Sequence, residues 1–165
     1  MKYVKKKLKI EGTNFQKIIN KFGTPSYCYS YLKLKENINH FKKSFNSFSP
    51  LICFAVKSNT NVSIIREIKK FGLGADVVSI GELMMALKAG INPNKIVFSG
   101  VGKTYNEINF AIKKKILLIN AESLSEIKEI NKIAKLKKKI VRIGVRLNPN
   151  TDANTLSQIS TGKKE

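Results

Sequence analysis

Short apolar segments recur at a regular interval along the chain. They begin at residues 51, 75, 95, 116 and 140, so that successive starts differ by 24, 20, 21 and 24 residues. Each has the length of a buried strand, and the stretches between them carry apolar residues three and four positions apart, which indicates amphipathic helices. We expect strands at LICFAV, ADVVS, KIVFSG, ILLINA and IVRIGVRLN, which are residues 51–56, 75–79, 95–100, 116–121 and 140–148.

Glycines and capping residues mark the ends of the predicted helices. Gly72 and Gly90 follow helical segments, as C-terminal caps do. Three helical segments are preceded by serine or threonine with a glutamate three residues later, which is the spacing of a capping box. These pairs are Ser79 and Glu82, Thr104 and Glu107, and Ser123 and Glu126. The alternation of strands and capped helices predicts βα units and a parallel sheet.

Two architectures are built from such units: an open doubly wound sheet and a (β/α)8 barrel. The residues after the first strand read Lys-Ser-Asn-Thr-Asn and not a Gly-rich loop, which disfavours a dinucleotide-binding domain. The even repeat favours an α/β barrel of the TIM type, although five strands are fewer than the eight that a barrel needs. We therefore expect a lead-in over residues 1–24 and the N-terminal part of a truncated barrel over residues 25–165.

The chain is strongly basic, with a formal net charge of +20. Only three of the 31 cationic residues are arginines, and the lysines are spread along the chain, so we favour solvated surfaces over a nucleic-acid interface. The runs 113–115 and 137–139 are expected at helix ends or in loops. No apolar stretch has the length of a membrane span, and we expect a cytoplasmic protein that binds neither membrane nor nucleic acid.

The cysteines and the histidine carry little chemistry. Cys28 and Cys53 have the spacing of neither a zinc site nor a redox pair, and we expect both to be buried thiols. His40 is the only histidine, which makes a Ser-His-Asp triad improbable. We expect no metal site.

Lys57 ends the most strand-like segment of the chain, ICFAV. Chemistry in barrels takes place at the carboxyl ends of the strands, and a desolvated lysine can attack an aldehyde such as that of pyridoxal phosphate. Asp76 lies within the next strand and would approach Lys57 if the two strands are neighbours. Position alone leaves a second interpretation open, since one of 28 lysines can fall at a strand end by chance.

Several stretches together resemble the alanine-racemase-like, barrel-type pyridoxal-phosphate decarboxylases. FGTPSYCYS (22–30) is similar to the opening strand of that family, FAVKSN (54–59) to its cofactor-lysine motif and GADVVSIGEL (74–83) to its second strand and helix. IVFSGVGKT (96–104) and VRLNPNTDANT (145–155) resemble the branch that acts on meso-diaminopimelate, and ISTGKKE (159–165) is similar to the start of the segment that leads on to KFG. The combination of these stretches favours that branch over the ornithine-type decarboxylases.

The resemblance implies roles for four residues. Lys57 matches the lysine that forms a Schiff base with pyridoxal 5'-phosphate, and Asp76 matches an acid beside that lysine and the cofactor. Arg146 matches the arginine of the fifth strand near the cofactor, and Glu82 matches an acid with a supporting role. A structural ion pair is the alternative for Asp76 and Arg146, and a helix cap is the alternative for Glu82.

The activity that the resemblance implies is decarboxylation of meso-2,6-diaminopimelate to L-lysine and carbon dioxide, the last step of lysine biosynthesis, by a homodimer when full length. The C-terminal β-domain of the family is not expected in this chain. Residues 1–165 alone are therefore expected to be inactive and to bind the cofactor weakly. Decarboxylation of ornithine, arginine or a polyamine precursor is one alternative, and a non-enzymatic basic protein that binds nucleic acid is another.

Overall fold

The computed structural model describes residues 1–45 and 47–148. The chain forms two compact units, Met1–Pro50 and Leu51–Glu165, and each is described by itself. The boundary expected after residue 24 stays a prediction. In the described part of the chain, no helix is both long and apolar enough to cross a membrane.

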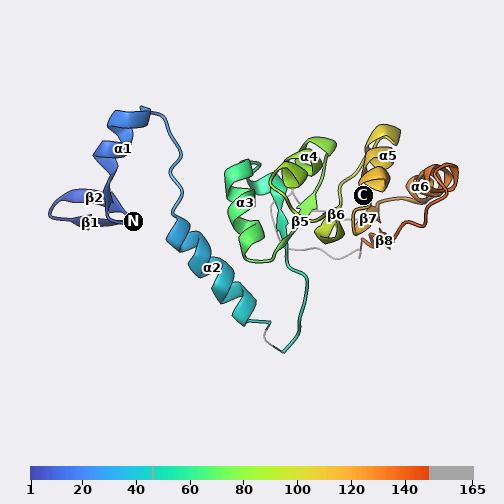
Figure 1. The fold of residues 1–165 in the computed structure, drawn as a ribbon, viewed down its shortest axis with the longest axis horizontal. Helices are drawn as coiled ribbons and strands as arrows, with labels where there is room; N and C mark the ends of the chain where they lie inside the picture. The colour runs from blue at the N-terminus through green and yellow to red at the C-terminus, as the bar shows by residue number, and fades with distance from the viewer. Residues whose placement is uncertain (46, 149–165) are drawn as a thin grey trace. The chain divides into compact units, whose positions relative to one another are not determined.

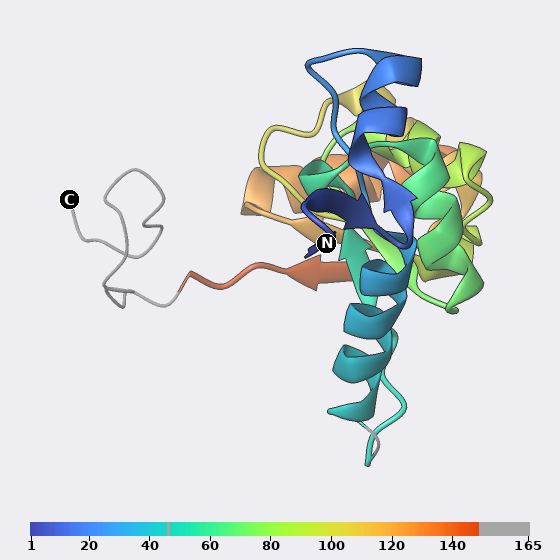
Figure 2. The ribbon, with the colours of Figure 1, turned by 90° about the vertical axis from the view of Figure 1, so that its left-hand side faces the viewer.

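The first unit holds a small antiparallel sheet and two helices. Strands β1 (Lys2–Val4), β2 (Lys7–Ile10) and β3 (Thr13–Asn14) pair in that order, and α1 (Phe15–Phe22) packs on β2 and β3 (Figure 2). Helix α2 (Tyr31–Lys43) is capped by Ser30, whose hydroxyl accepts a hydrogen bond from the Lys33 amide. The Glu11 carboxylate accepts from the Ser30 hydroxyl and the Leu32 amide, each at 2.7 Å, and these hydrogen bonds lower the pKa of Glu11.

The opening strand predicted at residues 22–30 is wrong. Phe22 ends α1, and the following residues up to the cap of α2 form neither helix nor strand. No strand of this unit pairs with the segment, and Tyr27 is 92% exposed. Cys28, expected to be buried, is consequently exposed.

The second unit contains the five predicted strands, which pair as one parallel sheet in the order of the chain (Figure 1). They are β4 (Cys53–Ala55), β5 (Gly74–Val77), β6 (Ile96–Phe98), β7 (Leu118–Ala121) and β8 (Ile143–Val145). Between them lie η1 (Val56–Ser58), α3 (Val62–Lys70), α4 (Ile80–Lys88), η2 (Pro93–Lys95), α5 (Tyr105–Lys114) and α6 (Leu124–Leu136). A doubly wound sheet reverses its strand order at a switch point, whereas this order runs without a reversal, as in a barrel.

One face of this sheet and the helices form the core. Residues two apart on a strand share a face, and the buried members of β5, β6 and β7 alternate accordingly with partly buried ones. The core joins these strand residues to the apolar stripes of the helices: Ala75, Val77, Ile96, Phe98, Ile119 and Ala121 from strands, and Ile65, Leu83, Ala86, Ile108, Ala111, Ile130 and Ile133 from helices. Asp76 and Asn120 alternate with these core positions and lie on the opposite face of the sheet.

The predicted caps explain where these helices begin and end. Thr104 and Glu107 form the expected capping box at α5, and the hydroxyls of Ser79 and Ser123 accept from the backbone amides of Glu82 and Glu126. Gly72 and Gly90 follow α3 and α4 with φ of 82° and 85°, as C-terminal cap residues do. The lysine runs 113–115 and 137–139 lie at the ends of α5 and α6, as predicted.

Candidate functional site

The polar side chains of the second unit gather at the carboxyl edge of its sheet. Parallel strands end at one edge, so residues at or just after their ends come together there. A hollow of about 440 Å³ lies at this edge. It is lined by Lys57, Asp76, Val78, Ser99, Gly100, Asn120, Glu122, Val145 and Arg146. We refer to this hollow as the carboxyl-edge pocket. The structure therefore brings together three of the four predicted site residues, and Glu82 is not among those that line the pocket.

Lys57 lies in η1, the turn that follows β4. The Ser58 hydroxyl donates to the Ala55 carbonyl at 2.7 Å and the Asn59 amide donates to the Val56 carbonyl at 2.9 Å, which fixes this turn. Val56 is fully buried, whereas the neighbouring Lys57 is exposed. Within residues 1–45 and 47–148, its ammonium group forms no ion pair. The turn thus presents an accessible amine at the pocket.

Asp76 lies beside β4, because it pairs in register with Ala55. Its Oδ1 accepts a hydrogen bond from the Ser99 hydroxyl at 2.7 Å, and Asn120 Nδ2 donates to Ser99 Oγ at 3.0 Å. Strand β5, the residue that follows β6 and strand β7 therefore contribute to one hydrogen-bonded row across the pocket. Asp76 forms no ion pair with any residue that the structure describes.

Arg146 follows β8 and faces Glu122, which follows β7. Arg146 Nη1 lies 3.3 Å from Glu122 Oε2, and the Arg146 amide donates to the Ala121 carbonyl at 3.0 Å. The Arg146 side chain is 51% exposed, whereas that of Glu122 is 10% exposed. The ion pair that the sequence left open for Arg146 is therefore present, and it leaves much of the guanidinium accessible.

Glu82 makes a contact at the N-terminus of α4 instead. It is the third residue of α4, and its Oε2 accepts from the Val78 amide at 3.0 Å. Ser79 is the cap residue, and in a capping box the glutamate would accept from the Ser79 amide. Glu82 accepts instead from the amide of the preceding residue, Val78. A supporting role for Glu82 in the site stays a prediction.

Glu122 in the pocket and Lys103 beside it were missed from the sequence. Glu122 was not singled out, although it directly follows a strand and the strand-end rule would have indicated it. Lys103 was missed as well; its side chain is only 1% exposed and pairs with Glu126 at 2.7 Å. No motif within one segment could have indicated this pair, because it joins the loop before α5 to α6.

Cys53 lies on β4 and is partly buried, so the expectation of a buried thiol holds only in part. Burial raises the pKa of the Cys53 thiol, and the negative charge of Asp76 raises it further. The thiol is thus kept protonated, as in an inert structural cysteine.

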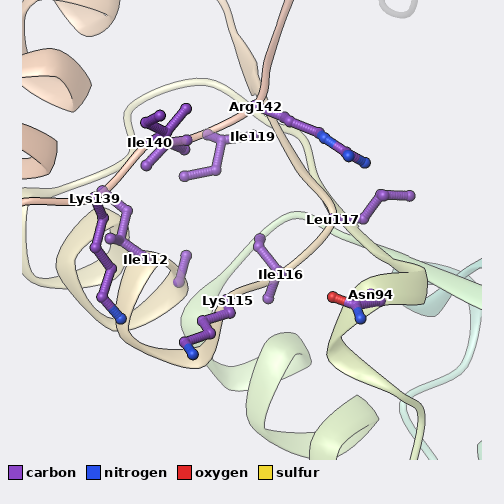
Figure 3. A pocket seen from close by; sticks show the side chains of 11 residues that line it. Asn94, Ile112, Lys115, Ile116, Leu117, Ile119, Lys139, Ile140 and Arg142 are labelled. Carbon is purple, nitrogen blue, oxygen red and sulfur yellow. The ribbon is translucent and has the colours of Figure 1, made fainter.

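A larger hollow of about 640 Å³ lies at the opposite edge of the sheet (Figure 3). It is lined by residues that precede β6, β7 and β8, among them Asn94, Leu117 and Arg142. Figure 3 shows isoleucine side chains gathered around it, with Lys115 and Lys139 among the lining residues. It contains no ion pair in the described part of the chain and lies away from the strand ends where barrel chemistry is found. Although this hollow is larger, the carboxyl-edge pocket is therefore the better candidate for the functional site.

Fold and site together define the class of protein: a (β/α)-barrel segment that gathers a lysine, a carboxylate and an arginine at the carboxyl edge of parallel strands. Residues 32–165 match the family described as pyridoxal-dependent decarboxylase, pyridoxal binding domain. The chain belongs to this family, and its cofactor is accordingly pyridoxal phosphate.

Diaminopimelate decarboxylases are among its relatives. The protein of that name from Helicobacter pylori strain J99 is 47% identical over 152 residues, a match that covers 92% of this chain and 38% of the relative. The one from Aquifex aeolicus is 41% identical over 165 residues and is covered to 39%. The chain thus spans less than two fifths of the length of these curated relatives.

Solved structures agree with these matches. The crystal structure of diaminopimelate decarboxylase from H. pylori complexed with L-lysine has a TM-score of 0.88 at 46% identity, covering 92% of this chain and 39% of that one. A diaminopimelate decarboxylase from M. jannaschii has a TM-score of 0.89 at 35% identity, and the match covers 98% of this chain and 38% of that one. A lysine/ornithine decarboxylase from Vibrio vulnificus, with a TM-score of 0.71 at 16% identity, shares the fold.

Proposed function

We propose that this chain is the cofactor-lysine part of an enzyme that decarboxylates meso-2,6-diaminopimelate to L-lysine and carbon dioxide. The observation that carries the proposal is that Lys57, Asp76 and Arg146 line one pocket in a chain 47% identical to a diaminopimelate decarboxylase. We further propose a homodimeric, cytoplasmic protein, an inference that rests on the resemblance alone.

The residues present fit pyridoxal phosphate. The Lys57 amine is accessible and free of a carboxylate partner among the described residues, as a group that condenses with an aldehyde must be. The pocket volume lies within the usual range of ligand sites, roughly 300 to 1,000 Å³. When bound, the cofactor supplies an electron sink for the carbanion that decarboxylation leaves.

The side chains of this chain have three tasks in the proposed reaction. Lys57 would hold the cofactor covalently through its side-chain amine. Asp76, held by Ser99 at 2.7 Å, sets a fixed negative charge beside that lysine. Arg146 keeps guanidinium donors beyond those used by Glu122 and offers them to an anionic group in the pocket.

Borohydride reduction tests the role of Lys57. The 165-residue chain is incubated with a limiting amount of pyridoxal phosphate, reduced and digested, and the labelled lysines are quantified by mass spectrometry. We expect the label to be concentrated on the peptide that contains Lys57, because among the lysines that the structure describes it alone combines an accessible amine with the carboxyl-edge pocket.

Matched controls come from the opposite edge of the sheet. Lys115 and Lys139 line the larger hollow (Figure 3), so Lys115→Ala and Lys139→Ala should leave the labelling unchanged, whereas Lys57→Ala should reduce it to background. Equal labelling of Lys57 and these two lysines would refute the assignment.

Catalysis is tested in a hybrid enzyme, in which this chain replaces the matching 38% of the H. pylori relative. We expect lysine formation from meso-diaminopimelate by the hybrid and none by its Lys57→Ala variant. A hybrid that folds and binds the cofactor through Lys57 without forming lysine would contradict the proposed activity.

A further inference from the structure

A buried ammonium group lies just outside the carboxyl-edge pocket. The Lys103 side chain is 1% exposed, and its Nζ donates to the Gly100 carbonyl at 2.6 Å, the Asn120 carbonyl at 2.6 Å and Glu126 Oε1 at 2.7 Å. A lysine has three donors, and here each has an acceptor, which is the condition for burying such a charge. Lys103 thereby ties the loop after β6 to the end of β7 and to α6.

Glu126 links Lys103 to Glu122 by accepting hydrogen bonds from both residues. While its Oε1 accepts from Lys103, its Oε2 accepts from the Glu122 amide at 2.9 Å. The Glu122 carboxylate in turn accepts from the Gly100 amide at 3.2 Å and pairs with Arg146 at 3.3 Å. A series of contacts thus leads from the buried ammonium through two carboxylates, which are joined by one backbone hydrogen bond, to the arginine in the pocket.

The same contacts hold the turn that carries Ser99. Its neighbour Gly100 donates its amide to Glu122 and accepts at its carbonyl from Lys103, so both sides of this residue are fixed. The Ser99 hydroxyl then donates to Asp76 at 2.7 Å. Asp76 and Arg146, which share the pocket with Lys57, are consequently linked by these contacts to a pair that does not line it.

We propose that Lys103 and Glu126 are positioning residues of the carboxyl-edge pocket. They hold Glu122 and Gly100, and through them they set the direction of the Arg146 guanidinium and of the Ser99 hydroxyl. The geometry stands on the chain itself, whereas the consequence for cofactor binding rests on the proposed function. The test therefore has one arm without cofactor and one with it.

The first arm measures amide hydrogen exchange in the 165-residue chain by NMR. In Lys103→Met we expect the Gly100 and Glu122 amides to exchange at least about tenfold faster, which is the loss of a hydrogen bond to a charged group. The Ile119 amide, which bonds to the Arg142 carbonyl within the sheet, should keep its rate. The Arg146 Nε–Hε signal should shift.

Glu126→Gln carries the same test if Lys103→Met does not fold, because it removes the charge and keeps the shape. Lys103→Arg should restore part of the protection. Lys70→Met removes the exposed Lys70–Glu67 pair and should alter none of these signals. Exchange at Gly100 and Glu122 that is unchanged, or that rises only together with Ile119, would show a merely structural pair and overturn the proposal.

The second arm measures pyridoxal phosphate labelling of Lys57 by borohydride reduction. We expect Lys103→Met to require at least about tenfold more cofactor for half-maximal labelling, again the scale of one charged hydrogen bond. If the wild-type chain does not label at Lys57, the proposed function fails while the exchange arm still decides the positioning role. Equal labelling of both chains, with unchanged exchange, overturns that role.

Discussion

A methyl group added at Gly100 should destabilise the fold, because the position has little room for a Cβ atom. Its φ is +95°, and a Cβ built there would lie 3.1 Å from Val78 Cβ and 3.2 Å from the Val78 carbonyl oxygen. Gly102, two residues along the same loop, has φ of +72° and nothing within 4 Å of such a Cβ. Gly100→Ala and Gly102→Ala therefore differ mainly in the contact with Val78.

The magnitudes follow from three contributions. An alanine with positive φ destabilises the folded state by about 1 to 2 kcal/mol. Alanine also lowers the conformational entropy of the unfolded chain relative to glycine, which offsets about 0.4 to 1 kcal/mol of that loss. Both contributions apply to the two variants alike. Crowding against Val78 adds about 1 to 3 kcal/mol at Gly100 only. We expect Gly102→Ala to lose about 1 kcal/mol and Gly100→Ala about 2 to 4 kcal/mol.

Urea unfolding followed by far-UV circular dichroism measures the two losses, and since the chain has no tryptophan, tyrosine emission provides the second probe. The slope of the free energy against urea should match between variants, so that the midpoints alone report stability. Equal losses for Gly100→Ala and Gly102→Ala would refute the argument, because the contact with Val78 would then cost nothing.

Two further substitutions test single side chains. The Glu107 carboxylate accepts from the Thr104 amide and hydroxyl and from the Ile80 amide, and these hydrogen bonds lower its pKa. The stability that they contribute is full above the unfolded-state pKa of Glu107 and is lost as pH falls through its folded-state pKa. The difference in free energy of unfolding between wild type and Glu107→Gln should therefore shrink below about pH 4. A gap that stays constant in pH-dependent urea titrations would contradict this assignment. Lys57→Ala should change the free energy of unfolding by less than about 0.5 kcal/mol, because Lys57 is exposed and unpaired among the described residues; a loss of several kcal/mol in the same assay would indicate a structural lysine.

The sheet and its helices could be predicted because their signals are local. The repeat of apolar segments, the capping box of Thr104 and Glu107 and the glycines after α3 and α4 each lie within one stretch of sequence. The five strands and the barrel-type order were therefore predicted correctly, with the strands shorter than expected. The segment 22–30 failed because its strand-like residues have no strand beside them in the first unit.

The candidate site was predictable only in part, for the same reason. Lys57, Asp76 and Arg146 could be named from strand ends and from the resemblance, and the structure places all three at one pocket. The partners of these residues depend on strand register, which brings Ser99 to Asp76 and Glu122 to Arg146. The motif stretches beyond residue 148 lie outside the described residues.

The unbroken order of the parallel strands also determines when the pocket can exist during synthesis. Each strand pairs with the one made just before it, so the sheet can grow at one edge while the chain is still being elongated. Lys57 emerges with the first of these strands, and Arg146 follows about 90 residues later with the fifth. At a synthesis rate of roughly 5 to 20 residues per second, Arg146 is added roughly 4 to 18 seconds after Lys57. During that interval a nascent chain carries the Lys57 amine without the Arg146 guanidinium that lines the same pocket.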